Sequence, residues 1–187
     1  VDGILACAEG APVLDDVPAA GDAPDAPARA LRPVTIGFVS DLAFSFYYPE
    51  NLEALEAVLG ALSRTRIDRY VCVGDVVGYG ADPKACIDRV RDLCEVVVAG
   101  NHDWAVAGRL SMEFFNTYAR DAIAWTRTKL SPDDVSWLRD LPIRTDLEGI
   151  ATPVHSTLHN PAAFDYLLTS YDAHLSMAVL ELPLCFV

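Results

Sequence analysis

Six side chains that could bind a metal or move a proton lie just beyond the ends of short, β-branched runs in the sequence. They are Asp41, Asp75, Asn101, His102, Asp103 and His155. In open α/β sheets, ligands bind in the crevice outside the carboxyl ends of the strands. We therefore expect these six side chains to converge on one rim of a sheet.

Carboxylate, amide and imidazole groups in this mixture favour a site for divalent metals. They suit Mn, Fe, Zn or Ni, whereas the absence of cysteine near the expected rim argues against a structural zinc. Two metals about 3.5 to 4 Å apart can share one carboxylate, hold a hydroxide and clamp the oxygens of a phosphoryl group. Asp75 is central in the order of the strands, which makes it the best candidate for the shared carboxylate.

An alternation of strand and helix patterns must position these side chains. Apolar, β-branched runs at 34–40, 69–75 and 95–100 are separated by two helical patterns, NLEALEAVLGAL at 51–62 and PKACIDRVRDLC at 83–94. This order predicts a βαβαβ unit with parallel strands.

Three of the expected helices begin at residues that suit a helix N-terminus. These residues are Asn51, Asp82 followed by Pro83, and Ser131 followed by Pro132 with Asp134 in the capping-box position. Another helix is expected over FFNTYARDAIAWTRTKL at 114–130, and returning strands are expected within 143–155. In the first helix the spacing of the leucines predicts one buried face, formed by Leu52, Leu55, Leu59 and Leu62.

Composition divides the chain into two parts. Residues 1–33 are dominated by Ala, Pro, Asp and Gly, which predicts a flexible tail. The 187 residues, 52% of them hydrophobic, otherwise suit a single domain with a real core. We expect that domain to cover residues 34–187.

Three sequence blocks resemble the first signature motifs of the calcineurin-like metallophosphoesterases. They are SD at 40–41, GDVVGYG at 74–80 and GNHD at 100–103. The similarity continues through FNTYARDAIAWTR and VHSTLHNPAAFDYLL, which resemble the compact bacterial phosphodiesterase-like branch of the family. It implies an α/β fold in which a two-sheet sandwich is flanked by helices in four layers.

The resemblance also implies a role for each candidate residue. Asp41 would bind a first metal, Asp75 would bridge two metals, and Asn101 and His155 would bind the second. His102 would be the catalytic general acid, with Asp103 orienting its ring. The implied activity is hydrolysis of a small phosphomonoester or phosphodiester with two divalent ions, manganese foremost and iron, zinc or nickel as alternatives.

Two departures from the family pattern fall on metal ligands. Ala43 stands where the first block has a ligand histidine, and it is followed by an apolar, aromatic stretch, FSFYYPE. The Gly-His-any-His block that follows a strand like LPLCFV in the family is absent from these 187 residues, so the domain is expected to be C-terminally incomplete. The alternative hypothesis is therefore a non-catalytic relic that acts as a binding or interaction protein. An open sheet edge would favour self-association into a homo-oligomer.

Charge and cysteine content exclude several other classes. With 27 acidic and 14 basic residues, the net charge of −13 argues against nucleic-acid binding by charge. No apolar run reaches the roughly 20 residues of a membrane span, and no signal-peptide pattern is visible. Five cysteines without a CxxC pair indicate reduced thiols, so we expect a cytoplasmic protein.

The glycines of GDVVGYG do not form a dinucleotide-binding motif. Pro83 stands where the third glycine of that motif is needed.

Overall fold

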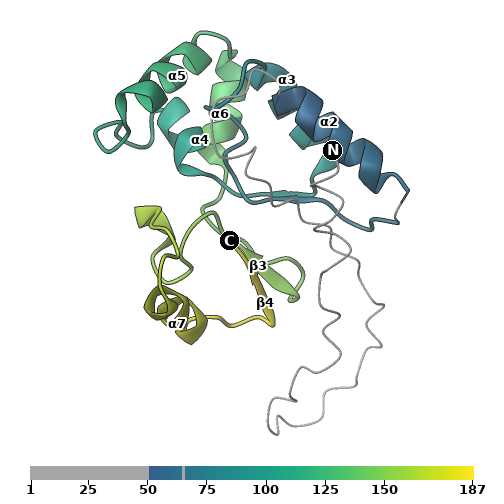
Figure 1. The fold of residues 1–187 in the computed structure, drawn as a ribbon, viewed down its shortest axis with the longest axis vertical. Helices are drawn as coiled ribbons and strands as arrows, with labels where there is room; N and C mark the ends of the chain where they lie inside the picture. The colour runs from purple at the N-terminus through teal and green to yellow at the C-terminus, as the bar shows by residue number, and fades with distance from the viewer. Residues whose placement is uncertain (1–50, 65) are drawn as a thin grey trace, which may run out of the picture.

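The computed structural model describes residues 51–64 and 66–187, with the backbone alone for 51–54. The expected tail at 1–33, the expected strand at 34–40, Asp41 and Ala43 all lie outside the described residues. In Figure 1 the helices α2 to α6 lie together at the top, and β3, β4 and α7 lie together below them.

Two strands and one helix form the parallel unit that the sequence predicts. Strand β1 (Val71–Cys72) pairs in parallel with β2 (Val96–Val97), in the register Val71 to Val96. Helix α3 (Pro83–Leu93) connects them, because parallel neighbours need a crossover connection. Helix α2 (Asn51–Leu62) precedes β1 and has Val58 buried and Leu55, Leu59 and Leu62 half-buried.

The predicted helix starts at Asp82 and Ser131 are confirmed. Asp82 is the N-cap of α3, with Pro83 at the first helical position. Ser131 is the N-cap of α6 (Pro132–Asp140), and its hydroxyl accepts a hydrogen bond from the Asp134 amide at 3.2 Å. The Asp134 carboxylate in turn accepts from the Ser131 amide at 3.0 Å, which completes the capping box.

The helix expected at 114–130 is shorter than predicted. Helix α5 spans Thr117–Arg127, because the side chain of Asn116 accepts a hydrogen bond from the Ala119 amide at 2.9 Å and caps the helix there. Phe114 and Phe115 therefore precede the helix. Phe114 is exposed, whereas Phe115 packs against the core.

An apolar cluster joins these helices to the loops after β1 and β2. Its buried members are Val77, Ile87, Ala99, Ala105, Val106, Ala107, Ile123, Leu138 and Leu141. They come from α3, from α4 (Asn101–Val106), from α5 and α6, and from the loops that follow both strands. The core therefore fixes the positions of the two strand ends that carry the candidate site residues.

The last part of the chain forms a second strand pair. Only 151–153 of the expected returning segment is a strand, β3 (Ala151–Pro153), which pairs in parallel with β4 (Leu184–Phe186). The residues before β3 fold back on it through isolated antiparallel bridges, such as Leu147 to Ala151. A short helix, η2 (Pro161–Ala163), and α7 (Ser170–Ala178) connect the two strands. The fold is α/β, as predicted; the four-layer sandwich stays a prediction.

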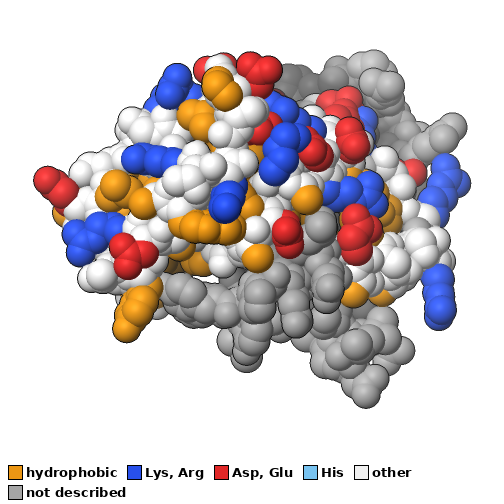
Figure 2. Space-filling model, turned by 90° about the horizontal axis from the view of Figure 1, so that it is seen from above, with side chains coloured by type: hydrophobic (Ala, Val, Ile, Leu, Met, Phe, Trp, Pro, Cys, Tyr) orange, Lys and Arg blue, Asp and Glu red, His pale blue; other side chains and the backbone are white. Residues whose placement is uncertain are grey.

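The described surface is mixed in charge. Figure 2 shows acidic and basic side chains interspersed with apolar ones on the face seen from above. The cysteines at 72, 86, 94 and 185 are free thiols and half-buried. None of the helices in the described part of the chain has the length and apolar character that a bilayer span requires.

Candidate active site

The GNHD motif forms the first turn of α4, directly after β2. Gly100 is the N-cap, so Asn101, His102 and Asp103 are the first three helical residues. The Asp103 carboxylate is fully buried and accepts hydrogen bonds from the Gly100 amide at 2.9 Å and from the Val77 amide at 3.2 Å. These bonds tie the loop after β1 to the loop after β2.

We expected Asp103 to orient the His102 ring, and the structure gives it a different set of partners. Both Asp103 oxygens bind backbone amides, whereas the Nδ1 atom of His102 is buried and has no hydrogen-bond partner among the described residues. Asp103 therefore orders the backbone of the two loops, and the ring of His102 is oriented by other contacts.

Asp75 occupies a backbone conformation that non-glycine residues rarely adopt. Its φ is 52°, in the left-handed region where aspartate is one of the more tolerated residues. The Oδ1 atom accepts a hydrogen bond from the His102 amide at 3.1 Å, and the carboxylate also forms a hydrogen bond with the Tyr79 side chain. Gly100 lies so close that an added Cβ would be 2.1 Å from Oδ1. The loop and α4 thus hold the carboxylate from several sides.

His155 meets Asp75 and Asn101 across the site. Its Nδ1–H donates a hydrogen bond to the Val73 carbonyl at 2.7 Å, because a carbonyl can only accept. In the neutral ring this leaves Nε2 as a lone-pair acceptor. Nε2 lies 3.1 Å from the Asn101 amide oxygen and 3.5 Å from Asp75 Oδ2. The Asn101 and Asp75 oxygens therefore both lie close to the lone pair of Nε2.

Burial governs the protonation of these groups. It lowers the pKa of His102 to about 4, with a further contribution from the charge of His155. Burial also lowers the pKa of His155, although the Val73 carbonyl and Asp103 oppose the shift. Both rings are thus neutral near pH 7. Burial raises the pKa of both Asp75 and Asp103, as expected for two carboxyl groups that lie in one buried region.

Comparison with known proteins identifies the family. A family model described as calcineurin-like phosphoesterase matches residues 34–176, which is most of the chain. The chain belongs to the calcineurin-like phosphoesterase family.

One of the similar solved structures is itself a metallophosphoesterase. The chain is 41% identical to a metallophosphoesterase from Sphaerobacter thermophilus, whose crystal structure superposes with a TM-score of 0.61 over 73% of this chain and 55% of that one. It is 38% identical over 124 residues to the uncharacterized protein MJ0912 of Methanocaldococcus jannaschii, a match that covers 65% of this chain and 51% of the relative. The hypothetical protein PH1004 from Pyrococcus horikoshii OT3 shares the fold at 22% identity, with a TM-score of 0.56 over 73% of this chain and 62% of that one. The chain thus spans about half the length of these first two relatives.

The structure brings together most of the predicted site residues. Asn101 and Asp75 each lie within hydrogen-bonding or near-contact distance of His155, and the His102 amide donates a hydrogen bond to Asp75. Asp41 lies outside the described residues. In the described part of the chain, no group of three or more His, Cys, Asp and Glu side chains is arranged to hold a metal ion, so a metal site here would depend on the amide of Asn101 as well.

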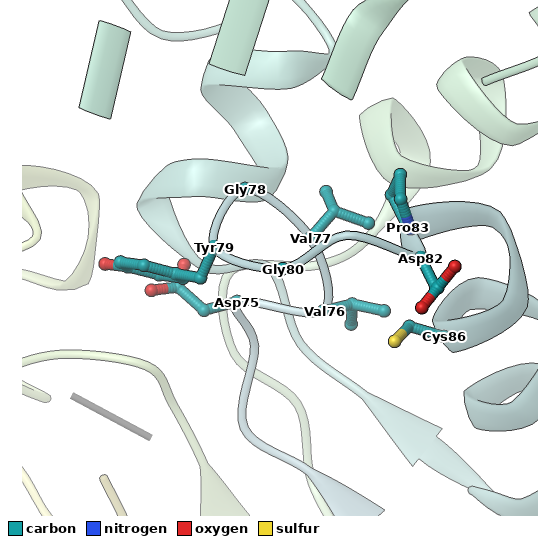
Figure 3. A pocket seen from close by; sticks show the side chains of 9 residues that line it. All are labelled: Asp75, Val76, Val77, Gly78, Tyr79, Gly80, Asp82, Pro83 and Cys86. Carbon is teal, nitrogen blue, oxygen red and sulfur yellow. The ribbon is translucent and has the colours of Figure 1, made fainter. Parts of the chain in front are cut away.

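Sequence reasoning missed two aromatic residues beside this set. In Figure 3 the Tyr79 side chain lies beside Asp75, on the opposite side of the loop from Asp82 and Cys86. Phe164, with a φ of 55°, lies 6.1 Å from the His155 ring and packs edge-on against Trp104. Tyr79 lies within the quoted GDVVGYG block, so its position was visible, but nothing in the sequence marked Phe164.

A hollow opens on the His155 side of the site. It has a volume of about 210 Å³, and its lining includes Asn101, His155, Phe164, Tyr166, Leu167 and Val187. One wall therefore carries two of the proposed metal ligands, and the other is largely apolar. Such a hollow can admit a small ester with its phosphoryl group toward the polar wall.

Proposed function

We propose that this phosphoesterase hydrolyses a small phosphomonoester or phosphodiester with divalent metal ions, manganese foremost, bound at a dinuclear site. Asp75, Asn101 and His155 would hold one ion, and Asp41 would share a second with Asp75. The observation that supports this proposal most directly is the position of His155 Nε2. It lies 3.1 Å from Asn101 Oδ1 and 3.5 Å from Asp75 Oδ2.

The donor set fits a transition metal on chemical grounds. Neutral His155 presents the lone pair of Nε2 to the Asn101 and Asp75 side chains, because the ring hydrogen is on Nδ1 and donates to Val73. Imidazole nitrogen and carboxylate or amide oxygen are ligands that divalent transition metals accept. Two ligands about 2.1 Å from one ion and at right angles to each other are about 3 Å apart, which agrees with the separations found here.

The other side chains support the binding of a phosphoryl group. When bound, the metals would supply an activated water and Lewis-acid stabilisation of the phosphoryl oxygens. His102 lies one residue from Asn101 and is proposed to act at the leaving-group oxygen as general acid. Phe164 and Tyr166 would contact the organic part of the ester in the hollow.

A second candidate function is supported by one sequence feature. Ala43 stands in place of a ligand histidine of the family, which weakens the proposed first metal site. A chain that retained only the Asp75, Asn101 and His155 set would bind one ion and serve as a non-catalytic binding protein. We also propose a cytoplasmic location, which the free thiols at 72, 86, 94 and 185 support. Self-association into a homo-oligomer is proposed to occur at an open sheet edge.

One experiment separates the two functions. Metal content is measured by elemental analysis, and hydrolysis of bis(p-nitrophenyl) phosphate is followed with added Mn²⁺, for the wild type and for Asp75→Asn. The substitution should reduce turnover by more than about 100-fold, because even the hydrogen-bond partners of metal ligands contribute about 10–100-fold.

Asp82→Asn is the matched control. This carboxylate is exposed and makes no side-chain cap hydrogen bond, so its removal should leave metal content and turnover unchanged. Near two metals per chain with turnover that depends on Asp75 would establish the hydrolase. One metal without turnover would support the binding protein, and turnover that survives Asp75→Asn would contradict the assignment of Asp75.

A further inference from the structure

Tyr79 contacts both the proposed metal-bridging carboxylate and the proposed catalytic histidine. Its side chain forms a hydrogen bond with Asp75, and its ring lies 3.9 Å from the His102 ring between centroids. We propose that Tyr79 is a positioning residue that fixes the Asp75 carboxylate and the His102 ring relative to each other. The inference rests on the function proposed above and assigns a residue that the resemblance to the family does not.

The loop conformation explains how Tyr79 reaches Asp75. Asp75 and Gly78 both have positive φ, 52° and 105°, so the chain turns sharply within the block GDVVGYG. The turn brings the side chain at position 79 back beside the carboxylate at position 75, as Figure 3 shows. A side-chain donor in this place fixes which way the carboxylate faces, because the His102 amide holds only Oδ1.

The ring of Tyr79 also packs on the imidazole of His102. Tyr79 packs on the imidazole with an interplanar angle of 35°, and Phe115 meets it edge-on at 5.0 Å. Gly78 closes the remaining side, since an added Cβ there would be 2.6 Å from His102 Nδ1. No described residue forms a hydrogen bond with Nδ1, so packing replaces the hydrogen bond that usually orients such a ring.

The hydroxyl and the ring can be tested separately. Tyr79→Phe removes the hydroxyl that bonds Asp75 and keeps the ring, whereas Tyr79→Leu removes the ring contact as well. Mn²⁺ affinity is measured by titration calorimetry, and kcat and KM for bis(p-nitrophenyl) phosphate are measured at saturating Mn²⁺. Tyr171→Phe, at an exposed tyrosine of α7, is the matched control for loss of a hydroxyl.

The expected results differ between the variants. Tyr79→Phe should weaken Mn²⁺ binding by about 10-fold or more, as for other partners of metal ligands, and keep kcat near wild type once Mn²⁺ is saturating. Tyr79→Leu should weaken Mn²⁺ binding similarly and also lower kcat at saturating Mn²⁺, because His102 loses its support. A purely structural tyrosine would not divide affinity from kcat in this way. Wild-type Mn²⁺ affinity in Tyr79→Phe, or wild-type kcat in Tyr79→Leu, would overturn the proposal.

A measurement on metal-free protein separates this inference from the proposed function. The imidazole resonances of His102 are followed by NMR in the wild type, Tyr79→Phe and Tyr79→Leu. They should keep their positions in Tyr79→Phe and shift and broaden in Tyr79→Leu. If the wild type binds no Mn²⁺ and has no turnover, the proposed function fails. An unchanged His102 spectrum in Tyr79→Leu would overturn the positioning role whatever the metal result.

Discussion

Gly100→Ala is the substitution that should displace the proposed metal-bridging carboxylate with the smallest chemical change. Gly100 has a φ of −91° and a ψ of 169°, which alanine adopts without strain, so the backbone itself tolerates the change. The added Cβ, however, would lie 2.1 Å from Asp75 Oδ1 and 2.4 Å from the Asp75 amide nitrogen. One of these two atoms is backbone, so rotation of the Asp75 side chain cannot relieve both contacts.

The size of the effect of Gly100→Ala follows from the steric overlap between the added Cβ and Asp75. Ordinary contact begins at 3.4 Å, so Asp75 Oδ1 must move by about 1.3 Å and the backbone nitrogen by about 1.0 Å. Overpacking of this kind costs about 1–3 kcal/mol of stability. A displacement of about 1 Å at a catalytic group lowers turnover by about 100-fold. Mn²⁺ affinity should fall too, because Asp75 leaves the position from which it faces His155.

Three assays check this prediction. They are denaturant unfolding, Mn²⁺ titration and hydrolysis of bis(p-nitrophenyl) phosphate. The control is Gly60→Ala in α2, where an added Cβ meets nothing within 4 Å. That change should raise stability by about 0.5–1 kcal/mol and leave the site unaffected. If Gly100→Ala kept wild-type Mn²⁺ affinity and turnover, the close approach of Gly100 to Asp75 could not be what sets the carboxylate.

Two further predictions concern the imidazole and a helix cap. His102→Asn should lower turnover by about 100-fold or more and leave metal content unchanged, as measured by elemental analysis; loss of metal would instead make His102 a ligand. Asp134→Ala should reduce the free energy of unfolding by about 1–2 kcal/mol at pH 7, because it removes the capping box of α6. Burial alone would raise the pKa of Asp134, but hydrogen bonds from Ser131 and the charges of Lys84 and Arg91 outweigh it and hold the pKa below its ordinary 3.8. The ionised Asp134 carboxylate therefore stabilises the fold above about pH 4, and this stabilisation is lost as the pH falls below that value. Urea unfolding curves of the variant and the wild type should accordingly converge in acid. A difference in the free energy of unfolding that did not change with pH would contradict a role for the carboxylate charge.

Local signals in the sequence predicted the helices well. The caps at Asp82 and Ser131 depend on residues within one helical turn, and both are found where expected. The alternation of patterns also predicted the parallel pairing of β1 and β2. The helix start at Thr117 was misplaced because the apolar Phe114 and Phe115 extend the pattern, whereas the side chain of Asn116 ends it.

Contacts distant in sequence could not be predicted from the residues alone. The Asp103 carboxylate binds the Val77 amide 26 residues away, although the same carboxylate was expected to hold the adjacent His102 ring. His155 donates to the Val73 carbonyl across 82 positions, and that bond decides which ring nitrogen is free. Carbonyl and amide groups are present at every residue, so no residue type marks the one that will be used.

Hydrogen bonds at both ends of α4 hold Asn101, one of the proposed metal ligands, in its place beside His155. A helix of six residues is marginal by itself, yet its carbonyls are held at the C-terminal end by two arginines. Arg127 donates to the carbonyls of Val106 and Ala105, and Arg139 donates to that of Ala107. The N-terminal end is tied to the neighbouring loop through Asp103 and Asp75, as described above. Since both ends of α4 are tied to neighbouring segments, Asn101 keeps its position opposite His155 Nε2, and this pair is the part of the proposed metal site that the fold itself supports.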